Sequence, residues 1–143
     1  MNKEVNKFDA IDDMDHSLFQ ILSNAAKIIQ STRENKSNYT IIREVRKYTE
    51  THHTNPELSL SHLSDEFNIN VKSLSRLFKE EFGENFIDYL AKIRVEHAQK
   101  LLQQTNDSVY EISEKVGYTN TNTFIRVFKR TSGFTPGDYR EKH

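Results

Sequence analysis

The sequence predicts an all-α protein in which two copies of one helical unit are joined by a long central helix. Residues 76–89 recur fifty positions later as 126–139, with Arg, Phe, Lys, Gly, Asp and Tyr in register. Gly and Pro are scarce, at four and two in 143 residues, and no stretch sustains the alternation of a strand. Residues 85–104, between the copies, carry apolar side chains at helical spacing.

We expect residues 85–104 to form a single helix about 30 Å long. Asn85 is placed to cap it, and Asp88 lies near the positive end of the helix dipole. The length is close to the roughly 34 Å between major-groove turns on one face of B-DNA. The apolar stripe expected to be buried consists of Phe86, Tyr89, Leu90, Ile93, His97, Leu101 and Leu102.

Residues 1–40 differ from the rest, and we assign them to an N-terminal helix and a polar linker at 31–38. The helix carries a short heptad-like seam, which favours packing on a partner over a true coiled coil. Its acidic cluster lacks the Gly and the closing Glu of a calcium loop, so we exclude that interpretation. The seam consists of Met14, Leu18, Ile21, Ala25 and Ile28.

In the first repeated unit, capping and turn residues mark where each helix is expected to begin and end. Pro56 ends the preceding helix, Ser61 is expected to cap a short helix, and Asn68 suits the left-handed turn. Asn70 then caps a longer helix that Gly83 ends. A short helix, a tight turn and a second helix with a cationic face form a helix-turn-helix. The helices are expected at 40–53, 60–67 and 71–82.

The second unit repeats this plan after the central helix. Ser108 and Glu111 have the form of a capping box, and Gly117 supplies the positive φ of the turn. Asn120 caps the second helix, and Gly133 ends it. The helices are expected at 112–116 and 121–131, with a last turn starting at Pro136.

The local charge of the two units differs from the net charge of the whole chain. The net charge is −1 and the pI is near 6.6, yet residues 69–79 and 118–133 each hold three cations and no anion. Such strips suit a polyanion. Cysteine is absent, which excludes disulfides and thiolate metal sites. No apolar run approaches the ~18 residues that span a bilayer, so we expect a cytoplasmic protein without membrane contact.

Residues 41–139 resemble the double helix-turn-helix DNA-binding domain of AraC/XylS-type bacterial transcription regulators. Ser64 and Ser113 stand where the family usually has Ala, and Asn68 where it often has Gly. The resemblance implies homeodomain-like three-helix subdomains and binding to double-stranded DNA, with RNA polymerase as a further partner. The matching residues are Leu74 to Lys79, Gly83, Phe86, Tyr89, Leu90, Arg94, Ala98, Leu101, Leu102, Ile112, Val116 to Tyr118, Phe124, Arg126, Phe128, Lys129, Gly133, Pro136, Tyr139 and Arg140.

The resemblance also assigns the DNA-binding residues. Its base-facing positions fall here on Lys72, Ser75 and Arg76 in the first unit and on Thr121, Asn122 and Arg126 in the second, and Thr123 is also expected to bind DNA. Lys79, Lys129 and Arg130 are expected at phosphates. Arg94, midway along the central helix, is expected to tie the two halves together.

The resemblance implies domains at 1–40 and 41–143, and a sensor or receiver domain that residues 1–40 are too short to form. We expect residues 1–40 to dock on that missing domain or to self-associate weakly. A small stand-alone regulator is the alternative. No cofactor, metal site or enzyme activity is expected, because the six histidines lack ligand spacing and no nucleophile or phosphate-loop motif occurs. Two alternatives stay open: a helical protein-interaction module, and a DNA-binding accessory domain of a larger enzyme.

Overall fold

The computed structural model describes residues 18–26 and 37–143, and every regular element in those ranges is a helix. The predicted all-α class is thereby confirmed. The chain divides into a compact N-terminal part, Met1–Tyr39, and a compact C-terminal part, Thr40–His143. Within the described ranges, no helix is both long and apolar enough to cross a bilayer.

In the N-terminal part the structure describes a helix over residues 18–26. Leu18, Phe19, Ile21 and Leu22 are exposed on it. The predicted seam lies only in part within this helix, since Met14 and Ile28 fall outside the described residues, as do the acidic cluster and residues 31–36 of the expected linker. Residues 37 and 38, also expected in the linker, are helical instead.

A helix over residues 37–52 begins in the last residues of the N-terminal part and continues into the C-terminal part. It ends in a turn before Pro56, as predicted. Helix α2, Leu60–Phe67, follows, and its N-cap is Ser59 rather than the predicted Ser61. The Ser59 side chain accepts a hydrogen bond from the backbone N–H of His62 at 3.1 Å. Both serines flank the start of the helix, and only Ser59 has the extended backbone that a cap requires.

The turn after α2 and the helix that follows it agree with the sequence. Asn68 adopts the left-handed conformation at φ 51° and ψ 49°. Asn70 caps α3, Val71–Phe82, by accepting from the backbone N–H groups of the first turn. Gly83 ends α3 at φ 75°. Phe78 of α3 is fully buried in the first hydrophobic core.

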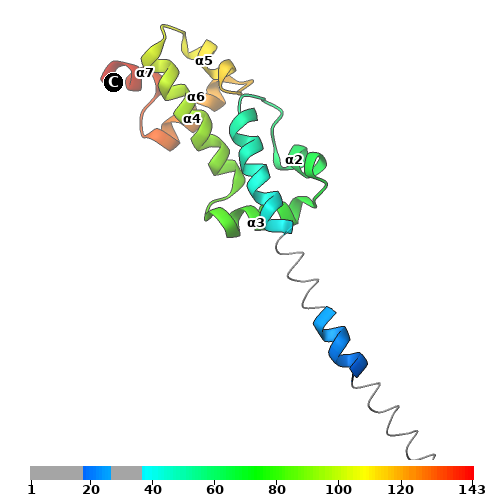
Figure 1. Ribbon diagram of the computed structural model, residues 1–143. Coiled ribbons are helices and arrows are strands. Elements are labelled where there is room, and N and C mark those ends of the chain that lie inside the picture. The colour runs from blue at the N-terminus through cyan, green and yellow to red at the C-terminus, as the bar shows by residue number, and fades with distance from the viewer. Residues whose placement is uncertain (1–17, 27–36) are drawn as a thin grey trace, which may run out of the picture. The chain divides into compact units, whose positions relative to one another are not determined.

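Helix α4, Phe86–Gln104, is the predicted central helix, capped by Asn85. Figure 1 shows α2 and α3 at one end of it and α5, α6 and α7 at the other. Each end packs into a different core, so the buried face is wider than the predicted stripe. Ile93, His97 and Leu101 of that stripe are only partly buried. The buried positions that the stripe missed are Ala91, Arg94, Val95 and Ala98.

The second core is formed by α4 with the three C-terminal helices. These are α5, Val109–Lys115, α6, Thr121–Ser132, and α7, Pro136–Lys142. The predicted capping box of Ser108 and Glu111 and the predicted cap at Asn120 are present, and Thr135 caps α7. Helix α5 is longer at its start than the predicted 112–116.

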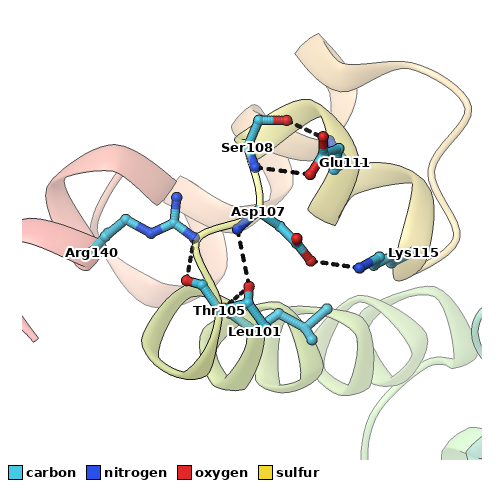
Figure 2. Close-up of polar contacts among 7 residues, drawn as sticks. All are labelled: Leu101, Thr105, Asp107, Ser108, Glu111, Lys115 and Arg140. Carbon is cyan, nitrogen blue, oxygen red and sulfur yellow. Dashed lines mark hydrogen bonds and ion pairs between the residues drawn. The ribbon is translucent and has the colours of Figure 1, made fainter.

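The junction between α4 and α5 is closed by side-chain hydrogen bonds (Figure 2). The Thr105 hydroxyl donates to the Leu101 carbonyl at 2.6 Å and ends α4. The Arg140 guanidinium of α7 donates to the Thr105 carbonyl at 3.1 Å and to the Leu102 carbonyl at 3.1 Å. Arg140 thus satisfies carbonyls that the end of a helix leaves unpaired.

The repeat extends further than the sequence comparison showed, because the helix over 37–52 and α4 play equivalent roles. Each of these helices precedes a helix-turn-helix and contributes buried side chains to the hydrophobic core of that motif. The Tyr89 hydroxyl donates to Glu50 at 3.0 Å, and Gln103 donates to the Tyr139 hydroxyl at 3.2 Å. In both copies of the repeat, a tyrosine after the helix-turn-helix is therefore hydrogen-bonded to a residue near the end of the long helix that precedes the motif.

Candidate nucleic-acid interface

Helix α3 presents a polar face opposite the side that it buries. Lys72, Arg76 and Lys79 are exposed, and Ser75 is half-buried. Leu74 and Phe78, on the opposite side, are completely buried. Helical periodicity thus fixes the direction of the cationic side chains.

Helix α6 presents the same pattern fifty residues later. Asn122, Arg126, Lys129 and Arg130 are exposed, while Thr121 and Thr123 are half-buried. The Arg126 guanidinium lies 3.5 Å from the Thr123 hydroxyl, one turn nearer the start of the helix. The Thr121 hydroxyl lies 3.5 Å from that of Ser113 on α5, so it also takes part in packing the two helices together.

The two helices differ in charge at three equivalent positions: Lys72 against Asn122, Glu80 against Arg130, and Glu81 against Thr131. Arg76 pairs with Glu80 at 3.9 Å, and both side chains are about two-thirds exposed, at 66% and 64%. A surface pair of this kind is weak. Helix α6 contains no acidic residue, so its face is the more positive of the two.

A buried arginine joins the two helix-turn-helix units, as the sequence predicts. Arg94 is only 7% exposed. Its Nε donates to the His53 carbonyl at 2.7 Å, and its Nη2 donates to the Asn55 carbonyl at 2.8 Å. Its guanidinium also lies 5.0 Å from the ring centroid of Tyr118, in the turn of the second unit. Burial lowers the pKa of Arg94 from its ordinary value, but an arginine stays charged.

Gly117 allows this close approach. Its φ is 109°, a conformation that favours glycine. A Cβ at this position would lie 2.7 Å from the His53 carbonyl oxygen and 2.9 Å from Arg94 Nε. The glycine that sequence reasoning placed for the turn therefore also holds the second unit against the first.

A histidine pair lies beside this contact, and sequence reasoning missed it because the two residues are 44 positions apart. His53 Nε2 and His97 Nδ1 are 3.0 Å apart. His53 Nδ1 faces the Glu50 carbonyl at 2.8 Å and must donate to it, so a neutral His53 accepts from His97. Burial lowers the pKa of His97, and the neighbouring His53 and Lys100 lower it further. In the described ranges, no group of three potential ligands could hold a metal ion.

Comparison with known proteins identifies the same region of the chain. Residues 63–142 match the family model described as "Helix-turn-helix domain". The transcriptional regulatory protein YesN of Bacillus subtilis (strain 168) is 42% identical over 91 residues, which cover 62% of this chain and 25% of YesN. The chain spans 12–26% of the length of three curated bacterial regulators that it matches.

Two solved structures share the fold. One is the C-terminal domain of AraT, a response regulator from Geobacillus stearothermophilus, with a TM-score of 0.71 and 37% identity over 72% of this chain and 85% of that one. The other is the DNA-binding domain of the global transcriptional factor AdpA in complex with a target DNA. It has a TM-score of 0.66 and 24% identity over 71% of this chain and 90% of that one, and supports the fold alone.

The matched region contains both helix-turn-helix motifs except the start of α2, together with the helix that joins them. The order of the elements is the one that the sequence resemblance implied, and the caps of α3 and α6 and the arginine between the two units are those predicted from the sequence. The chain therefore belongs to the AraC/XylS type of helix-turn-helix transcription regulators.

Proposed function

We propose that this chain binds double-stranded DNA by placing α3 and α6 in two successive major-groove segments on one face of a bacterial promoter. The observation that supports this proposal is the equivalence of α3 and α6: the same exposed positions carry arginine and lysine on both helices. Helix α4 has 19 residues and is about 28 Å long. Successive grooves repeat at about 34 Å, so bending of the DNA would improve the fit.

The base-reading residues are those nearest the starts of the two helices. Lys72, Ser75 and Arg76 serve the first groove segment in this proposal. Thr121, Asn122, Thr123 and Arg126 serve the second. An arginine can donate to both acceptors of a guanine, and an asparagine can pair with adenine.

Arg126 is better prepared for this role than Arg76. The Arg126 guanidinium contacts the Thr123 hydroxyl, toward the start of α6. The Arg76 guanidinium instead contacts the Glu80 carboxylate, one turn further along α3. The Arg76–Glu80 pair is weak, but Glu80 adds to α3 a negative charge that α6 lacks. We therefore expect the second unit to contribute the larger share of affinity.

Lys79, Lys129 and Arg130 are proposed to bind phosphates, which fix register without reading sequence. RNA polymerase is the proposed partner on the promoter, and a sensor or receiver domain of the same regulator is the proposed source of the signal. Residues 1–40 would connect that domain to the DNA-binding domain at 41–143. We propose a cytoplasmic regulator that is not an enzyme, in keeping with the family.

The test is the salt dependence of binding to duplex DNA, measured with the 143-residue chain. Each phosphate contact adds about 0.9 to the slope of log affinity against log salt. Lys129→Gln should lower that slope by about one and weaken binding to all sequences alike. Lys92→Gln, which removes an exposed lysine of α4, is the matched control and should leave the slope unchanged. Absence of binding at low salt would favour the protein-interaction module instead.

A further inference from the structure

A cavity of about 370 Å³ opens between the two helix-turn-helix units, in the space that α4 spans. We call it the inter-unit groove. The start of α2 forms one wall, α4 forms the floor, and α6 with the turn before it forms the other wall. The lining residues that matter here are Leu58, Leu60, Ile87, Leu90, Val127 and Arg130.

The floor of the groove is apolar, and on the α2 side Leu58 and Leu60 alternate with Ser59 and Ser61. Leu58 and Leu90 are buried, at 4% and 8% exposure, and close the bottom. Ile87 is 67% exposed at the groove. A concave, mostly apolar surface with a few polar or charged groups at its edge is the usual form of a ligand-binding site.

The charge of the groove has one sign. Among the described residues that line it there is no Asp or Glu, and the two charged residues are Arg94 and Arg130. Arg94 already donates to two backbone carbonyls, but Arg130 is exposed. Arg130 also borders the hollow on α6 that Thr123 and Arg126 line, so it lies between the groove and the recognition face.

We propose that the inter-unit groove binds a small amphipathic carboxylate, with its apolar body against Ile87 and Leu90 and its carboxylate on Arg130. A volume of 370 Å³ is at the small end of the range for ligand pockets. A guanidinium and a carboxylate form a strong, bidentate hydrogen-bonded pair.

Such a ligand would weaken the binding of DNA. It would occupy Arg130, which the proposed function assigns to a phosphate, and it would sit between the two units whose spacing sets the groove segments that they reach. DNA and ligand should therefore weaken each other's binding by the same factor. This consequence rests on the proposed function, whereas the binding of the carboxylate does not.

The test uses 4-phenylbutyrate and 4-phenylbutanol, which share an apolar body and differ in charge. Isothermal titration of the 143-residue chain without DNA should show binding of the acid at least tenfold tighter than that of the alcohol. Arg130→Gln should abolish that difference. Equal binding of acid and alcohol to the unmodified chain, or no binding of the acid, would overturn the proposal.

Two exposed apolar residues give matched variants. Ile87→Asp should weaken binding of the acid at least tenfold, because it removes an apolar contact and adds a like charge. Tyr110→Asp, at a side chain 59% exposed on α5 and outside the groove, should leave binding unchanged. Circular dichroism checks that both variants are folded. If Ile87→Asp binds the acid like the unmodified chain, the groove is not the site.

A competition titration separates the two proposals. If the acid binds and a DNA duplex does not, the site stands and the proposed function fails. If both bind but neither affects the other, the site stands and its regulatory consequence is wrong.

Discussion

Replacing Arg94 by methionine removes the residue that joins the two helix-turn-helix units while retaining most of its apolar volume. The change deletes two hydrogen bonds from a charged donor, at 2.7 and 2.8 Å, and the contact with the Tyr118 ring. It also leaves the His53 and Asn55 carbonyls without this donor. Only 7% of Arg94 is exposed, so water does not readily replace it.

The expected cost follows from these contacts. A hydrogen bond to a charged group contributes about 1.5–3 kcal/mol, and the variant avoids the cost of burying a guanidinium. We therefore expect Arg94→Met to lower the free energy of unfolding by about 2–4 kcal/mol. Arg94→Lys keeps the charge but lacks the forked geometry that reaches both carbonyls, so it should fall between Met and the native arginine.

Urea denaturation followed by circular dichroism measures this change. Lys92→Met, on the exposed side of the same helix, is the control and should stay within about 0.5 kcal/mol of the unmodified chain. A second transition in Arg94→Met would indicate that the two units now unfold separately. A loss below about 1 kcal/mol with a single transition would refute the role of Arg94 as the link.

Two further predictions concern the same contact. Gly117→Ala should destabilise the chain by about 2–4 kcal/mol, because it combines a positive φ with a clash at the His53 carbonyl; Gly137→Ala, which meets nothing within 4 Å, should change stability by less than about 1 kcal/mol in the same urea titration. Because burial lowers the pKa of His97, the unfolded chain binds more protons below about pH 6.5. Stability should therefore fall as pH drops from about 6.5 through the lower folded-state pKa, and His97→Gln should flatten that part of the profile; an unchanged slope would exclude His97 as its source.

Much of the fold follows from local sequence signals. The caps at Asn70, Asn85 and Asn120 and the glycines that end α3 and α6 act within one turn of a helix, so the residue types alone fix them. Ser59 was missed because a second serine two positions on has the same chemistry, and the path of the chain decides between them.

The buried face of α4 was harder to predict. A single stripe assumes that one surface covers the whole helix, but α4 enters one core near Phe86 and another near Leu102. Ala91 and Ala98 are buried although their side chains are small. Small residues carry little hydrophobic signal, so the pattern did not include them.

The remaining features depend on distant parts of the chain coming together. The partners of Arg94 lie 39 and 41 residues away, and only the resemblance to a family suggested that it joins the halves. The histidine pair and the inter-unit groove have no local signature. The equivalence of Arg76 and Arg126, by contrast, was visible in the repeat itself.

The most direct measurement is a base-substitution titration with Arg76→Ala and Arg126→Ala on a duplex selected by the 143-residue chain. Each variant should lose preference at one base position, at about 1–3 kcal/mol, with the two positions roughly 10 base pairs apart. Lys129→Ala should weaken every sequence equally. If both arginine variants behave like Lys129→Ala on every duplex, α3 and α6 bind phosphates only, and sequence reading by two successive grooves is contradicted.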